Sequence, residues 1–238
     1  FGEGLTGARL SNFNQDISSW DTSIVTNMAY MFSGAIAFDK DLGGWDVSSV
    51  TNMAGMFFDA RVFDQDLGGW DVIKVTNMAQ MFLNARVFDQ DLGGWKVSKV
   101  RDMSQMFQGA WAFNNDGIDS INDNWDTSSV TNMAGMFNGA RAFKQPLNNW
   151  DVSKVKNLNY TFANATIFNH DLSDWDTSSV ETMEGTFLNA RAFDKSLTTV
   201  VNKWNTSKVT NMKDMFSGAI AFNKNISSWD TSRVTTMA

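Results

Sequence analysis

Aspartates recur at one position of a repeated string, directly after a tryptophan in Trp-Asp-Val/Thr-Ser. They are Asp21, Asp46, Asp71 (where Ile73 replaces the serine), Asp126, Asp151, Asp176 and Asp230, and Lys96 and Asn205 interrupt the row. Neighbouring outward carboxylates about 5 Å apart repel by about 1 kcal/mol in a watery dielectric, so such a row would attract cations or a basic partner. Each carboxylate could instead accept a hydrogen bond from the backbone N–H two residues later and close a turn. Both interpretations stay open, and we predict these aspartates as ligand-binding residues.

A second acidic pattern, Asp-x-Asp-Leu, could hold calcium between repeats, because carboxylate oxygens are the ligands that calcium prefers. The candidate ligands are Asp39, Asp41, Asp64, Asp66, Asp89 and Asp91. The pattern is lost at Lys144 and Pro146, and no glutamate follows at the spacing of a calcium loop. The alternative is a solvated turn whose side chains cap backbone groups. Calcium is the one cofactor that the sequence suggests.

Catalysis lacks its usual side chains in this sequence. Cysteine is absent, the single histidine is His170, and no glycine-rich phosphate loop occurs. His170 occupies a position that other repeats fill with Gln65, Gln90 or Lys195. Every candidate carboxylate is a repeated residue rather than a member of a unique pocket. We therefore expect a protein that is not an enzyme.

Tryptophans mark a repeat of about 25 residues along the whole chain. They are Trp20, Trp45, Trp70, Trp95, Trp125, Trp150, Trp175, Trp204 and Trp229. Longer units at 113–125 and 193–204 should bulge as loops. Trp111 lies outside this series, at a position where other repeats carry Arg61, Arg86 or Arg141. An exposed tryptophan there would be a binding hot spot, so Trp111 is a further predicted ligand-binding residue.

The apolar pattern within one repeat changes its period. Leu42, Trp45 and Val47 have the two-residue spacing of an extended strand. The pattern then continues through Met53, Met56, Phe57, Ala60 and Phe63, whose steps of three and four indicate a short helix or 3₁₀ segment. Equivalent residues of stacked repeats should form buried columns. An asparagine column that includes Asn52 and Asn77 should hydrogen-bond from repeat to repeat.

Length and charge narrow the class of protein. The 238 residues form a single array, 1–238, of about nine repeats, which we expect to be a fragment of a longer protein. A net charge of −7 without basic clusters argues against nucleic acid as a partner. No run reaches the roughly 18 apolar residues of a membrane-spanning helix.

The string W-D-V-S-x-V-T-N-M-x-x-M-F-x-x-A-x-x-F resembles the BspA-like leucine-rich repeat surface proteins, with L-x-x-W-x-V in place of L-x-x-L-x-L. The fold expected with this resemblance is an α/β repeat. It is a leucine-rich-repeat-like right-handed solenoid, with a parallel β-sheet on one face and short helical or 3₁₀ turns on the other. The resemblance implies a role in adhesion and in contact with a host or matrix.

Two functions follow as hypotheses. The first is an extracellular or cell-surface module that binds a protein or glycan, on a cell surface or in a matrix, through the sheet face. The second is a structural subunit that acts as a rigid spacer and packs against sister chains in a filament, sheath or complex.

Overall fold

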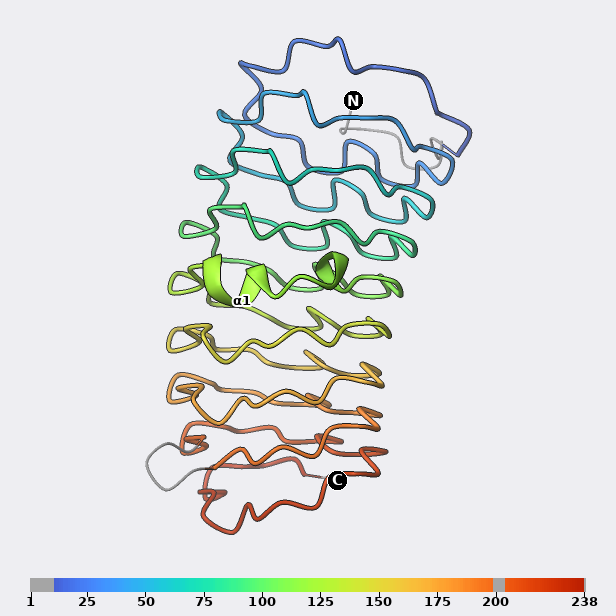
Figure 1. Ribbon diagram of the computed structural model, residues 1–238. Helices are drawn as coiled ribbons and strands as arrows, with labels where there is room; N and C mark the ends of the chain where they lie inside the picture. Colours follow the sequence, from blue (N-terminus) through green and yellow to red (C-terminus); the bar gives the residue numbers. More distant parts are fainter. Residues whose placement is uncertain (1–10, 199–203, 238) are drawn as a thin grey trace.

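The chain forms a stack of similar coils, in a computed structural model that describes residues 11–198 and 204–237. Figure 1 shows the coils one below another from the N-terminal to the C-terminal end. The helices among the described residues are a 3₁₀ turn, η1 (Asn115–Gly117), and one short α-helix, α1 (Ser120–Asn124). Both belong to a single coil near the middle of the stack. The remaining described coils are built from turns and extended segments.

Successive coils are joined by isolated parallel β-bridges rather than by strands. One residue of each coil makes the bridge, in the series Asn27, Asn52, Asn77, Asp102, Asn132, Asn157, Thr182, Asn211 and Thr236. The residue before each bridge residue adds a second backbone contact, as when Thr51 N donates to Thr26 O at 2.8 Å. This residue is Thr in most coils and is Arg101, Lys156 or Glu181 in the others. The bridges thus lie in the Thr-Asn-Met string.

The segment after each bridge divides its backbone N–H groups between two kinds of bond. Gly55 N donates to Ala79 O of the next coil at 2.8 Å, whereas Phe58 N donates back to Gly55 O at 3.0 Å. Alternate N–H groups therefore point to the neighbouring coil, and those between them close tight turns within the coil. This arrangement satisfies the backbone without a helix or a sheet, as a buried backbone requires. We call this side of the coil the turn side.

Two positions per coil on the turn side have a left-handed backbone. The first is held by Tyr30, Gly55, Gln80, Gln105, Gly135, Tyr160, Gly185 and Asp214. The second is held by Gly34, Asp59, Asn84, Gly109, Gly139, Asn164, Asn189 and Gly218. The second series consists of Gly, Asn and Asp, which are the residues that adopt this conformation at least cost. The alternation of left- and right-handed residues bends the chain back at each turn.

The predicted α/β leucine-rich-repeat-like solenoid with a parallel sheet is wrong. The described residues contain no sheet, and the parallel pairing consists of single bridges. The bridges also lie in the Thr-Asn-Met string, not in the Leu-x-x-Trp-x-Val segment where the strand was expected. The steps of three and four after Val50 come from successive tight turns, because the left-handed residues prevent a helix from continuing.

The core columns predicted from the repeat are confirmed. Met53, Met78 and Met103 are completely buried. The Phe57 ring stacks on Phe82 at 5.5 Å, and the Phe63 ring stacks on Phe88 at 6.1 Å. Aromatic pairs of this kind add about 0.5–1.5 kcal/mol beyond the burial of their area. The stack is therefore held by apolar contacts that repeat from coil to coil.

The tryptophan column, from Trp45 to Trp204, also fixes coils to the ones before them. Trp70 and Trp95 stack at 6.5 Å. The indole Nε1 of Trp95 donates to Leu67 O at 2.9 Å, and that of Trp70 donates to Leu42 O at 3.0 Å. A buried indole N–H needs such a partner. We call the side of the coil that carries this tryptophan and the following aspartate the tryptophan side.

The longer coil at 113–125 replaces one turn with η1 and α1. Ile121 of α1 is buried, and its carbonyl accepts the Trp150 indole N–H at 3.0 Å, so it takes the place of the usual leucine. Buried Asn115 binds the loop to the previous coil, because its Oδ1 accepts Leu92 N at 2.8 Å. The predicted bulge is thus a packed insertion. The other predicted loop, 193–204, lies partly outside the described residues.

Candidate ligand-binding surfaces

The seven predicted aspartates lie on the tryptophan side, and all of them are exposed. The capping bond is present at each one: Oδ1 accepts the backbone N–H two residues later, at 2.9–3.1 Å. Asn205 makes the same bond to Ser207 N at 3.0 Å. The carboxylates therefore close turns and still present negative charge outward. We call this column the aspartate row.

Serine lowers the pKa at four positions of the aspartate row. The Ser48 hydroxyl and then its backbone N–H lower the pKa of Asp46, and the repulsion from Asp21 is a weaker opposing cause. The serine two residues later lowers the pKa values of Asp21, Asp151 and Asp230 in the same way. Hydrogen bonds to the charged form outweigh neighbour repulsion here. The Asp-x-Ser string thus compensates for carboxylates placed in a row.

Trp111 lies in the middle of the stack with 39% of its surface exposed. The guanidinium carbons of Arg86 and Arg141, from the coils before and after it, lie 4.3 Å and 4.7 Å from the centre of the ring. Such cation–π contacts contribute about 0.5–1 kcal/mol each at exposed sites. Arg86 Nε is buried without a hydrogen-bond partner in the described part of the chain. Trp111 is therefore an exposed aromatic residue within a basic frame.

The six calcium candidates are engaged in hydrogen bonds, three of them between coils and three within their own turns. Asp39 Oδ1 accepts Asp64 N of the next coil at 3.2 Å, and Asp64 Oδ1 accepts Asp89 N at 2.9 Å. Asp41, Asp66 and Asp91 each accept the glycine N–H two residues later at 2.8 Å. Across residues 11–198 and 204–237, no three acidic or histidine side chains gather in a way that could hold a metal ion.

The asparagine column departs from the predicted ladder of stacked amides. Asn52 Oδ1 accepts Ala54 N at 3.1 Å, within its own coil, while the backbone of Asn52 forms the bridges to the adjacent coils. Asp102 can replace asparagine because this turn bond needs only a side-chain oxygen. The Asp102 carboxylate accepts the backbone N–H of Ser104 at 2.8 Å. The column closes turns, and inter-coil pairing comes from its backbone.

A groove of about 380 Å³ lies on the turn side and crosses three coils. Its lining is polar and uncharged, and consists of Ser104, Gln105, Gln108, Asn132, Ala134, Gly135, Asn138, Asn157, Asn159 and Tyr160. The sequence prediction missed this groove because it treated the repeats as equivalent. The available signal was a concentration of Gln and Asn at outward positions of these coils, where the first coils carry Ala54, Phe58 and Leu83.

A family profile described as "Mycoplasma protein of unknown function, DUF285" matches residues 5–121, 117–201 and 194–238. The chain belongs to the DUF285 family. The three matches follow one another along the chain, in agreement with an array of repeats. No curated protein matches the sequence. In this DUF285 chain, no helix of the described part is both long and apolar enough to cross a membrane.

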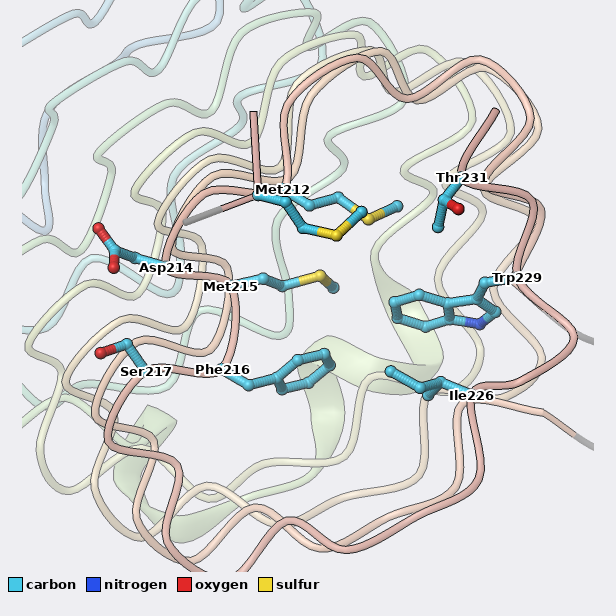
Figure 2. A pocket seen from close by; sticks show the side chains of 9 residues that line it. Met212, Asp214, Met215, Phe216, Ser217, Ile226, Trp229 and Thr231 are labelled. Atoms are coloured by element: carbon cyan, nitrogen blue, oxygen red, sulfur yellow. The ribbon is translucent and has the colours of Figure 1, made fainter. Parts of the chain in front are cut away.

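A second pocket of the DUF285 stack, of about 420 Å³, lies at the C-terminal end. Figure 2 shows Met215, Phe216 and Trp229 pointing into the interior from opposite sides of the coil, while Asp214 and Ser217 point outward. These inward residues belong to the buried columns of the coils before them. The pocket is thus the end surface of the core among the described residues.

Proposed function

We propose that this chain is a non-enzymatic interaction module of an extracellular or cell-surface protein, and that it binds a protein or glycan partner through its outer surface. The observation that carries the proposal is the aspartate row, a line of seven exposed carboxylates on one side of the stack that Lys96 and Asn205 interrupt. The hydrogen bonds from Asp-x-Ser hold the carboxylates in fixed positions. A fixed row of negative charge favours a partner with a complementary basic surface.

The resemblance to BspA-like surface proteins supports adhesion as the biological setting of this proposal. The distribution of side chains supports a role in binding rather than in catalysis. His170 is half-buried beside Phe168, with ring centres 6.1 Å apart. The repeated carboxylates take part in the same turn bonds in each coil. Trp111, framed by Arg86 and Arg141, is a second proposed contact for a partner.

The test separates the charge of the aspartate row from its turn bonds. Purified protein would be screened against defined matrix proteins and an array of glycans. Each binder would then be measured with a variant carrying Asp46→Asn, Asp71→Asn, Asp126→Asn and Asp151→Asn. Asparagine keeps the capping oxygen, as Asn205 does at the same position, and removes the negative charge. We expect the fold to be kept and the affinity to fall, with a weaker dependence on salt.

A control variant with four alanines at the same positions loses both the charge and the turn bonds. Equal affinity of the four-asparagine variant and the unchanged protein would rule out the aspartate row as the binding surface. If no matrix protein or glycan binds, and sedimentation shows that the purified chains associate with one another, the chain is instead a rigid spacer in an assembly of sister chains.

A further inference from the structure

The groove on the turn side exists because side chains of different size meet at one column. Gln105 and Tyr160 hold the first left-handed position in the coils on either side, and Gly135 holds it between them. A Cβ atom at Gly135 would lie 3.1 Å from Gln108 Oε1 and 3.2 Å from Gln105 Cγ, so the floor is closely packed. Its volume of about 380 Å³ lies within the range of small-molecule sites, about 300–1,000 Å³.

All six amide oxygens that line the groove accept hydrogen bonds from the protein itself. Their donors are Gln80 Nε2 for Gln105, Gln105 Nε2 for Gln108, Ala134 N for Asn132, Asn164 Nδ2 for Asn138, Asn159 N for Asn157, and Glu184 N for Asn159. These bonds fix the direction in which each amide points. Because each amide oxygen is held toward its donor, the NH₂ group of the same amide points in the other direction.

Five of these amides keep an NH₂ group that donates to no described residue. They are those of Gln108, Asn132, Asn138, Asn157 and Asn159. The sixth, Gln105, donates to Gln108 at 2.9 Å. The groove thus offers several oriented donors, while each of its amide oxygens already accepts at least one hydrogen bond from the protein. A ligand that suits it must bring hydrogen-bond acceptors.

The charges around the groove favour a ligand that is uncharged and carries hydrogen-bond acceptors. Its lining contains no acidic or basic residue. At one end Tyr160 donates its hydroxyl to Glu184 Oε1 at 2.5 Å, and this bond lowers the pKa of Glu184, which stays negative. An anionic ligand would be repelled there, in a protein of net charge −7. The Tyr160 ring adds an apolar surface held in place by the same bond.

We propose that this groove binds a short neutral oligosaccharide, whose hydroxyl, ring or acetamido oxygens accept from the amide donors and whose C–H face packs on Tyr160. The groove crosses three coils, or about 10 Å at the spacing of parallel chains, and so matches a chain of sugars better than a single ring. The proposal rests on the role as an interaction module but uses the turn side. Figure 2 shows that side, with Asp214 and Ser217, across the core from Trp229.

The chain contains a matched control for Tyr160. Tyr30 has the same backbone conformation, and its ring lies over Gly55 as that of Tyr160 lies over Gly185. Its hydroxyl donates to the amide oxygen of Gln80 at 3.3 Å, and the outward positions that carry Gln108 and Asn138 at the groove carry Phe58 and Leu83 here. The two tyrosines thus share their backbone position and differ in the donors around them.

The experiment is calorimetric titration of the protein with cellobiose, mannobiose and N,N′-diacetylchitobiose, and with the acidic disaccharide of hyaluronan. Ala134→Lys should fill the groove without harm to the fold, because Lys213 holds the equivalent position in another coil. Asn138→Ala removes one donor, and Ala163 is its equivalent elsewhere. Tyr160→Gln removes the ring, and Tyr30→Gln is its control. Circular dichroism and thermal melting would check that each variant is folded.

We expect at least one neutral probe to bind with an affinity that does not change with salt. Ala134→Lys should abolish this binding, Asn138→Ala should weaken it about two- to tenfold, as the loss of one hydrogen bond predicts, and Tyr30→Gln should leave it unchanged. The proposal is overturned if no neutral probe binds, if only the acidic disaccharide binds, or if folded Ala134→Lys binds as well as the unchanged protein. Binding by the four-asparagine variant would show that the groove acts independently of the aspartate row.

Discussion

The two sides of each coil contact the next coil through different chemical groups. On the tryptophan side the contacts come from side chains, such as the Trp95 indole that donates to Leu67 O. On the turn side they come from the backbone, as in the bond from Gly55 N to Ala79 O. Side chains that make contacts must be the same in each coil, whereas side chains that project from a bonded backbone are free to differ.

This difference explains where regular and local features occur. The tryptophan side repeats Trp, Asp and Ser, and it presents a row of carboxylates that only Lys96 and Asn205 interrupt. The turn side carries Tyr, Gly, Gln or Asp at its first left-handed position, and a groove forms where Gly135 falls between Gln105 and Tyr160. A uniform surface suits an extended partner, and a local groove suits a small ligand.

The largest expected effect tests whether the tryptophan side depends on its side chains. Trp95→Ala removes a fully buried ring and its bond to Leu67 O, and should lower the free energy of unfolding by about 3–5 kcal/mol. Trp111→Ala, outside the column and 39% exposed, should cost far less. Urea unfolding measured by circular dichroism would compare them. Similar losses for the two variants would mean that the column does not carry the stability.

A pair of glycines tests whether the turn side depends on its backbone. Gly139 has a φ of 74°, and an added Cβ would meet nothing closer than 3.8 Å, so Gly139→Ala isolates backbone strain, at a cost of about 1–2 kcal/mol. Gly69, which precedes Trp70, is not left-handed and has no atom within 4 Å of an added Cβ. Gly69→Ala should be neutral or stabilising by up to about 1 kcal/mol. Thermal and urea unfolding would show opposite signs for the two variants.

The pH dependence of stability should report on the aspartate row. The folded pKa values of Asp21, Asp46, Asp151 and Asp230 lie below the ordinary value of an aspartate. The folded protein therefore binds fewer protons than the unfolded chain near pH 4, and these groups stabilise it above that pH. Their contribution is lost as the pH falls through the lowered values. The four-asparagine variant should lose less stability between pH 6 and pH 3 in urea titrations, and parallel curves would contradict this.

The sequence predicted the core and not the backbone. A column of Trp95 or Phe82 must be buried wherever coils stack, so apolar periodicity was sufficient to place it. The same periodicity could not distinguish a helix from successive tight turns, since both place every third or fourth residue inside. The deciding signal was the Gly, Asn and Asp series at Gly34, Asp59 and Asn84, which indicates left-handed turns in place of a helix.

Of the two candidate sites, the sequence predicted the aspartate row and not the groove. Asp46 is a repeated residue with a repeated neighbour, Ser48, so its capping bond followed from local sequence alone. The groove depends on side chains from three coils, and on which amide oxygens the neighbouring coils occupy. That information is a property of packing between repeats. A comparison of each outward column along the array would have shown where amides gather, but not which of their groups remain free.

The smallest expected effect concerns Tyr160, on the turn side. Its bond to Glu184 raises the pKa of the phenol to about 12, so the neutral form is favoured in the fold and this stabilisation is lost only as the pH rises through that value. Both groups are partly buried at the surface, and Tyr160→Phe removes a single hydrogen bond, so it should cost about 1 kcal/mol. Absorbance titration should lose an ionisation near pH 12 in Tyr160→Phe. Because Glu184→Gln removes the charged acceptor but leaves Tyr160 in place, this variant should instead move that ionisation toward lower pH. An unchanged titration in Glu184→Gln would mean that the bond does not hold the Tyr160 ring beside the groove.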